Sequence, residues 1–354
     1  MTAYIIRRLL IMPLIMFGVT LLIFSMLQIL GPVERSALYV RDIPKTQSQI
    51  DAIIRRYGLD DPVHLQYWNW MVGYKDPETG ERLGGVLRGD LGFSRTGREP
   101  VTDMLKRRFP ATLELALWAM IPIIAGGIWM GIKAALNHNK LFDQIVRVFA
   151  TIGWSFPTFV LALLLLLIFY ARLDWFQTGR LSTEFTLLVG RPGFTKYTGL
   201  MTIDSLLNLR FDVFLDALRH LVLPVITLAV VQWALLLRVT RSSMLEEMRQ
   251  DYVRTARAKG LYESTVVNKH IRRNALIPVI TIVGGTLAGL MNGVVVTEVI
   301  FNYPGLGQMA AAAATQLDVL TMLGFALFNG VLFIFAYLIV DIMYVVIDPR
   351  IRLS

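Results

Sequence analysis

Few residues of this 354-residue chain have the types and spacings that catalysis needs. The four histidines lie far apart in different connecting regions, and no two have the i, i+4 spacing of a HExxH metal helix. They are His64, His138, His220 and His270. The chain has no cysteine, so disulfides and thiolate metal sites are excluded. It also has neither a Walker A loop nor a glycine-rich phosphate loop after a strand. We therefore expect no catalytic residue, no bound cofactor and no metal site.

A second group of polar side chains lies within or near the ends of long apolar runs. Polar groups inside a membrane are costly, so they either hydrogen-bond to neighbouring helices or line a water-filled path. The pattern leaves both readings open. The amides are Gln232, Asn292 and Asn329, and the acids are Glu114, Glu298 and Asp341. The acids occupy the outer parts of their runs and do not form a pair that suits a proton relay.

The elements that position these residues are predicted to be membrane-spanning helices. Hydrophobic residues make up 55% of the chain and charged residues 17%, with a mean hydropathy of +0.55. A soluble domain is roughly a quarter charged, and a spanning helix needs about 20 mostly apolar residues. The sequence predicts an all-α protein with six transmembrane helices, at about 9–30, 111–136, 148–170, 221–237, 275–299 and 323–347, with Pro157 as a kink in the third.

The order of apolar and polar stretches gives the domain organisation. Residues 1–30 form an N-terminal transmembrane helix, uncleaved because its apolar run exceeds a signal-peptide core. Residues 31–108 form a sizeable extracytoplasmic segment, with a turn at 58–62. Residues 109–347 form a five-helix core that contains a cytoplasmic loop at 238–275, and 348–354 form a cytoplasmic tail. The short basic connections fall on one side, which places both termini in the cytoplasm. The net charge of +9 therefore indicates lipid headgroups and not nucleic acid.

Glycines in two predicted spans recur every four residues. Gly285, Gly289 and Gly293 do so in the fifth span, and Gly127 and Gly131 in the second. Small residues at this spacing form a groove in which helix backbones approach closely. The partner helix belongs either to this chain or to a second subunit, and the pattern leaves both possibilities open.

The loop at 238–275 has a helix–glycine–helix pattern. DYVRTARAKG, residues 251–260, reads as a short helix with Asp251 near its start and Lys259 near its end, as the helix dipole favours. Gly260 suits the left-handed terminator. The small residues Ala256 and Ala258 would let the helix enter a partner's groove. The alternative is a basic amphipathic helix on lipid headgroups. The candidate residues for such a contact are Asp251, Arg254, Ala256, Ala258, Lys259 and Gly260.

Five stretches resemble one transporter family. DYVRTARAKGL with HIRRNALIP resembles the cytoplasmic EAA loop of ABC importer permeases, in particular the B-type membrane subunit of the dipeptide/oligopeptide/nickel branch. The start YIIRRLLIMPLIMFGVTLLIFSML is similar to that branch's first span. Three further stretches are similar to the same branch and follow in the same order. They are its entry into span two (GDLGFSRTGREPV with RFPATLELAL), its loop after span five (EVIFNYPGLGQM) and its C-terminal tail (DPRIRL). The loop departs from the general motif, since Arg254, Thr255 and Ala256 stand where Glu-Ala-Ala begins it, and Arg272 and Arg273 replace its Leu-Pro.

The resemblance implies a type I ABC importer permease fold and a set of partners. It implies a second, C-type permease subunit, two ABC ATPase subunits that bind ATP and magnesium, and an extracytoplasmic solute-binding protein. The helix before Gly260 would be the coupling helix that docks on an ATPase, and its ATPase-coupling residues would be Asp251, Arg254, Ala256, Ala258, Lys259 and Gly260. The chain would lie in the cytoplasmic (inner) membrane and carry no catalytic residue. Possible pathway or packing residues are Gln232, Asn292, Asn329, Gly285, Gly289 and Gly293.

The resemblance predicts an importer of dipeptides or oligopeptides, with two alternative cargoes in the same branch. One is an oligosaccharide, and the other is nickel, which no cluster of histidine and cysteine favours. An ion-coupled secondary transporter belongs to another class and would need charges at span midpoints and inverted repeats, neither of which is clear in the sequence. A membrane scaffold without transport is a further class.

Overall fold

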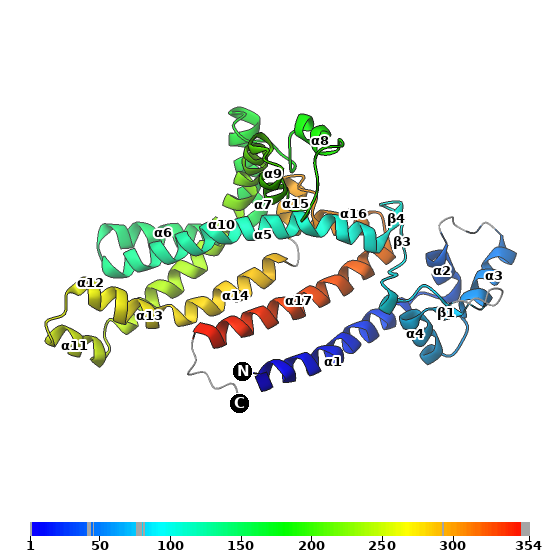
Figure 1. The fold of residues 1–354 in the computed structure, drawn as a ribbon, viewed down its shortest axis with the longest axis horizontal. Coiled ribbons are helices and arrows are strands. Elements are labelled where there is room, and N and C mark those ends of the chain that lie inside the picture. Colours follow the sequence, from blue (N-terminus) through cyan, green and yellow to red (C-terminus); the bar gives the residue numbers. More distant parts are fainter. Residues whose placement is uncertain are drawn as a thin grey trace. The chain divides into compact units, whose positions relative to one another are not determined.

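The computed structural model describes residues 2–40, 44, 46–75, 80, 82–291 and 294–347, without the side chains of 2–9 and 341–347. The predictions for Asn292, Gly293, the Asp341 side chain and the tail at 348–354 lie outside what is described. The chain divides into two units, drawn in Figure 1. The first comprises Pro110–Gly307 and the described residues from Phe335 onward, and the second comprises Thr2–Phe109 and Gln308–Ile334.

The described residues contain four helices that are long and apolar enough to cross a membrane. They are α1 (Thr2–Leu27), α5 (Val101–Leu136), α10 (Phe211–Glu247) and α17 (Val319–Ile347). Two bent helix pairs raise the number to six if each pair is one span. Each of the six expected spans overlaps one of these four helices or two bent pairs, and the all-α class is confirmed. Helix α10 extends beyond its expected bounds at both ends, because the flanking polar residues continue the helix.

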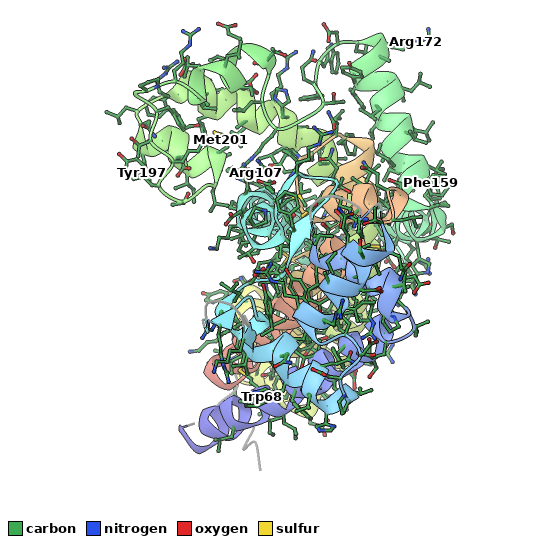
Figure 2. The ribbon with its side chains drawn as sticks, turned by 90° about the vertical axis from the view of Figure 1, so that its right-hand side faces the viewer. Trp68, Arg107, Phe159, Arg172, Tyr197 and Met201 are labelled. Carbon is green, nitrogen blue, oxygen red and sulfur yellow. The ribbon has the colours of Figure 1, made fainter. Side chains whose placement is uncertain are left out.

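The third expected span is not one kinked helix. It consists of α6 (Leu141–Ser155), followed by α7 (Thr158–Leu165) and a π-helical stretch η3 (Leu166–Arg172), and the two parts meet at 102°. Phe156 and Pro157 between them are extended, with ψ of 121° and 133°. Proline disfavours a helical conformation in the residue before it, so two consecutive residues leave the helix and the chain turns sharply. Figure 2 shows α7 and η3 as a continuous column from Phe159 to Arg172.

The fifth expected span is also interrupted. Its main part is α14 (Ile277–Met291), and a separate short helix, α15 (Val295–Ile300), contains the rest of the predicted run. Val294, which precedes α15, has φ −97° and ψ 68° and is not helical. The prediction of one helix through Val299 is therefore wrong, because hydropathy alone does not reveal a backbone break within a mostly apolar run.

The first unit is built around α10, which packs against α6, α7, α14 and α9 (Met201–Leu207). The short helices α11 (Asp251–Ala258), α12 (Glu263–Thr265) and α13 (Arg272–Ala275) gather at one end of this unit, with the π-helical η4 (Val266–Ile271) between the last two (Figure 1). Helices α8 (Thr183–Val189) and α9 occupy another end. Helix α16 (Leu306–Thr315) begins in this unit.

The second unit contains most of the predicted extracytoplasmic segment. After α2 (Pro32–Ser36) and η1 (Ala37–Tyr39) come α3 (Gln47–Tyr57) and α4 (Val63–Val72). Gly58 ends α3 with φ +60°, which confirms the expected turn. Two short antiparallel hairpins follow, separated by η2 (Val86–Arg88). The first pairs β1 (Tyr74–Lys75) with β2 (Arg82–Leu83), and the second pairs β3 (Phe93–Ser94) with β4 (Glu99–Pro100).

A buried carboxylate connects the second hairpin to the start of α17 within this unit. The Oδ2 atom of Asp318 accepts hydrogen bonds from the Ser94 hydroxyl (2.7 Å), the Thr96 backbone N–H (3.0 Å) and the Thr321 hydroxyl (2.8 Å). Burial alone would raise the pKa of Asp318, but these hydrogen bonds outweigh it and hold the pKa below its ordinary value. The ionised form therefore stabilises the unit.

We predict that Asp318→Asn lowers the stability of the second unit. The asparagine amide has one acceptor oxygen where the carboxylate has two, and its N–H group would face groups that are themselves hydrogen-bond donors. The expected loss is about 1–3 kcal/mol at neutral pH. A carboxylate whose pKa is lowered by folding contributes stability above its unfolded pKa of roughly 4, and the contribution is lost as the pH falls further. Thermal denaturation in detergent should therefore show a difference between wild type and variant that shrinks below about pH 4. A difference that is constant from neutral to acidic pH would contradict this role.

Candidate functional site

Helix α11 has the start and the stop that the sequence predicts. Gln250 precedes it in an extended conformation, and Asp251 occupies its first turn. Gly260 has φ +76°, its N–H donates to the Arg257 carbonyl (2.9 Å), and the Leu261 N–H donates to the Ala256 carbonyl (3.4 Å). This left-handed turn is the expected glycine terminator, and no neighbouring atom crowds Gly260. The helix–glycine–helix prediction is confirmed.

The two alanines of α11 lie on opposite faces. Ala256 is 6% exposed and packs, together with Val253, into a cluster of this chain's own apolar side chains, while Ala258 is exposed. The rest of the cluster comprises Ile132, Ala135, Met244, Val266, Val267, Ile271 and Ala275. The expectation that Ala256 enters a partner's groove is therefore wrong, since positions three residues apart share a helix face and Val253 commits that face to the core. The exposed face carries Asp251, Arg254, Ala258 and Lys259.

Polar contacts fix α11 to the segments on both sides of it. Arg257 forms a two-pronged ion pair with Glu263 across the glycine turn, with N–O distances of 2.7 and 3.1 Å, and this pair lowers the pKa of Glu263. The Tyr252 hydroxyl donates to Glu247 at the end of α10 and accepts from Asn274 in α13 at 3.0 Å. The loop is thus one folded body and not a flexible connection.

A matched pair of substitutions separates the two faces of α11. Ala256→Leu forces three carbons into the packed cluster and should cost about 1–3 kcal/mol of stability. Ala258→Leu adds the same atoms on the exposed face and should change stability by no more than about 0.5 kcal/mol. Thermal unfolding of both variants in the same detergent measures the difference. Equal destabilisation by the two would contradict the assignment of the faces.

Helices α5 and α10 approach closely through three glycines of α5. A side-chain carbon added at Gly127 would lie 2.6 Å from Leu236, and one added at Gly131 would lie 2.5 Å from Thr240. At Gly126 the obstacle is the Trp233 ring, whose Nε1–H donates to the Pro122 carbonyl (2.6 Å). The glycine spacing in the second span therefore marks packing within this chain.

Gly285 and Gly289 on α14 have the opposite environment. A side-chain carbon at either position would meet no atom within 4 Å. Both line an open hollow of about 740 Å³, together with Gln232 of α10 and Thr158 of α7. The structure thus brings together three of the predicted pathway residues. It does not support packing of these two glycines within the described chain, which leaves the alternative of a seam with a partner.

The two sets of glycines should respond differently to alanine. Gly131→Ala must push α5 away from α10 and should destabilise the chain by about 1–3 kcal/mol. Gly285→Ala enters open space in a helix and should be neutral or stabilising by up to about 1 kcal/mol in the isolated chain. Thermal unfolding of the purified single chain tests this pair, and a loss of stability at Gly285→Ala that equals the loss at Gly131→Ala would contradict it.

Sequence reasoning missed a buried polar network in the first unit. Glu114 of α5, 1% exposed, accepts hydrogen bonds from the Thr202 N–H (2.6 Å) and hydroxyl (2.8 Å) through Oε1. Its Oε2 atom accepts from Arg180 (2.6 and 2.8 Å) and from the Tyr303 hydroxyl (3.1 Å). The network joins α5 to the segment at 171–219 and to the loop after α15. Arg180, Thr202 and Tyr303 look like ordinary loop residues in the sequence, so only the lone acid Glu114 gave a signal.

The remaining polar residues of the predicted spans have different surroundings. Glu298 is buried and accepts from the Thr112 hydroxyl (2.8 Å), so both outer acids with described side chains hydrogen-bond to neighbouring segments. Gly307 lies close to the backbone of α15, since a side-chain carbon added at Gly307 would lie 2.6 Å from Val295. Asn329 belongs to the second unit, and its buried Oδ1 has no hydrogen-bond partner among the described residues.

The fold and the site together define a multi-pass α-helical membrane protein in which the short, charged helix α11 is held on the core. Sequence comparison identifies the family. Residues 123–353 match the binding-protein-dependent transport system inner membrane component, and residues 1–116 match the N-terminal component of the same kind of system. The chain therefore belongs to the family of inner membrane components of binding-protein-dependent transport systems.

Relatives match along the whole chain. The di/tripeptide transport system permease protein DppB of Pseudomonas aeruginosa is 39% identical over 99% of both chains. The oligopeptide transport system permease protein AppB of Bacillus subtilis is 36% identical over 99% of this chain and 100% of its own. The dipeptide transport system permease protein DppB of Escherichia coli is 36% identical over 99% of both. The family resemblance expected from the five sequence stretches is confirmed.

Proposed function

We propose that this chain is the transmembrane permease subunit of an ATP-driven, binding-protein-dependent importer of dipeptides or oligopeptides. The observation that carries the proposal is the similarity over nearly the whole chain to permeases named for such peptides, together with the family match at residues 123–353 of this chain. The chain itself contributes a path and a mechanical link, and ATP hydrolysis takes place in separate ATPase subunits.

The exposed face of α11 supports an ATPase dock. It presents Arg254, Lys259 and the small residue Ala258, while its opposite face is fixed to the core through Val253 and Ala256. A helix that is rigidly attached on one side and exposed on the other can transmit a displacement, because packed side chains resist compression. We therefore assign ATPase coupling to Asp251, Arg254, Ala258, Lys259 and Gly260, with Ala256 holding the helix in place.

The hollow beside α14 supports a second permease subunit. Gly285 and Gly289 have no covering atoms in this chain, and Gln232 lies in the same hollow with Thr158 and Thr286. A groove of small residues with a few polar groups suits either a close helix contact or a solute path. A C-type permease would face this surface, and the solute would pass between the two chains after delivery by an extracytoplasmic solute-binding protein.

The proposed orientation places both termini and α11 in the cytoplasm. The short basic connections support it, since the link that contains α11 carries Arg254, Arg257, Lys259 and Lys269. The segment at 31–108 would then face the solute-binding protein. Cysteines introduced at Lys259 and Arg55, both exposed, would report the sidedness in the otherwise cysteine-free chain.

Reconstituted transport tests the function directly. The chain, a C-type permease, two ATPases and a solute-binding protein from the same genomic neighbourhood are placed in proteoliposomes. Uptake of a labelled dipeptide should require ATP, the binding protein and this chain, and unlabelled oligosaccharide should not compete. Uptake by the purified chain alone, or competition by a sugar without competition by a peptide, would overturn the proposal.

The terminator glycine gives a sharper prediction within that assay. Gly260→Val should lower the number of peptides transported per ATP hydrolysed, because a β-branched residue resists the left-handed conformation at φ +76°. Gly260→Asn is the matched control, since asparagine tolerates this conformation far better. A fully inserted Gly260→Val protein with wild-type coupling would refute the role of the turn.

A further inference from the structure

The second unit contains a cavity of about 480 Å³ that the proposed transport path does not use. Its wall includes the end of α1, η1 and the glycine-rich turns on both sides of η2. The Tyr57 ring contacts those of Tyr39 and Tyr74 in tilted pairs, with ring centroids 4.6 and 4.4 Å apart, and these three rings line the cavity. Cavities of this size and aromatic character are typical of small-molecule sites.

A buried arginine that has no anionic partner among the described residues lines this cavity. Arg35 is 7% exposed, and all of its hydrogen bonds go to neutral oxygens: the side chains of Gln28 (2.8 Å) and Gln66 (2.5 Å) and the Leu59 carbonyl (3.1 Å). Its Nε has no partner, and no carboxylate pairs with it, among the described residues. A buried charge without a counter-ion is costly, so this guanidinium favours an incoming anion.

The neutral contacts hold Arg35 in one orientation. The Nε2 group of Gln66 donates to the carbonyls of Leu59 (2.9 Å) and Asp61 (2.5 Å), so its Oε1 atom must face Arg35. Gln28 donates to the same Oε1 atom at 3.0 Å. The arginine fork is therefore fixed before any ligand enters, which lowers the entropic cost of binding.

One acid accompanies this arginine among the described residues that line the cavity. Asp90 is exposed, and its Oδ1 atom accepts the Gly92 N–H at 2.9 Å, while its Oδ2 atom makes no hydrogen bond within the described chain. The adjacent wall needs glycine. A side-chain carbon at Gly85, where φ is +104°, would lie 2.5 Å from the Gly73 nitrogen. The cavity thus combines a buried cation, an accessible anion and an aromatic wall.

We propose that this cavity binds a zwitterionic small molecule with an apolar body, namely an amino acid or a short peptide, with its carboxylate on Arg35 and its ammonium on Asp90. Arginine matches a carboxylate through two parallel hydrogen bonds, and an aromatic wall accommodates an apolar side chain. This site goes beyond the proposed function, because it lies in the second unit and does not depend on which cargo crosses the membrane.

Ligand analogues test the two charged contacts in the full-length chain in nanodiscs. Calorimetric titration compares phenylalanine and alanyl-phenylalanine with the C-terminal amide and the N-acetyl form of the dipeptide. The zwitterions should bind in the millimolar range or tighter, and each blocked form should bind about tenfold more weakly or worse. Preference for phenylalanine over the dipeptide would assign the site to free amino acids, and the reverse preference would assign it to peptides.

Variants assign each contact to its residue. Arg35→Gln should abolish discrimination between the acid and the amide, and Asp90→Asn should abolish discrimination between the free amine and the N-acetyl form. Arg55→Gln, an exposed arginine of α3, is the control and should leave both intact. If the Arg35→Gln variant does not fold, two other measurements decide whether the cavity binds the zwitterion. They are titration of the Asp90→Asn variant, whose substitution is exposed, and titration of the wild-type chain with the blocked analogues.

Two results would overturn the proposal. One is an absence of zwitterion binding to the wild-type chain. The other is binding that Asp90→Asn and Arg35→Gln leave unchanged, which would place the ligand elsewhere. The transport assay is separate from this titration, so a failure of peptide transport and a failure of this cavity to bind are distinguished.

Discussion

The close contact between α5 and α10 is the constraint on which the first unit depends. Gly126, Gly127 and Gly131 let Trp233, Leu236 and Thr240 reach the backbone of α5. In a membrane the lipid tails are as apolar as the side chains, so close packing and not hydrophobic burial holds helices together. The hydrogen bond from the Trp233 indole to the Pro122 carbonyl adds a polar interaction between the two helices at the same contact. The ends of both helices are thereby held side by side.

That contact determines where α11 can lie. Ile132 and Ala135 near the end of α5 and Met244 near the end of α10 form one side of the cluster into which Val253 and Ala256 insert. The helix proposed to meet an ATPase is thus fixed to two spanning helices at once. Near its middle, α10 contributes Gln232 to the hollow beside α14. A push on α11 can therefore reach the proposed path through α10 without passing through a flexible segment.

Local patterns in the sequence predicted the local features and missed the contacts between distant segments. Apolar runs located the spans, and Gly260 located the helix end, because both depend on neighbouring residues. The 102° turn at Pro157 was underestimated, since a proline indicates a break but not its angle. The role of Ala256 was wrong because small residues suit an internal contact as well as an external one. Arg35 and Glu114 gave no strong signal, because most of their partners are distant in the sequence, up to 31 residues away for Arg35 and up to 189 for Glu114.

The central claim is that α11 moves as one body with the ends of α5 and α10. The chain has no cysteine, so spin labels on Leu136→Cys and Lys259→Cys, both exposed positions, would be the only labels in this subunit. Pulsed electron paramagnetic resonance on the assembled complex then measures the distance between them with and without ATP. The account predicts one narrow distance distribution that ATP leaves unchanged. A shift or a broadening of that distribution on ATP binding would contradict it.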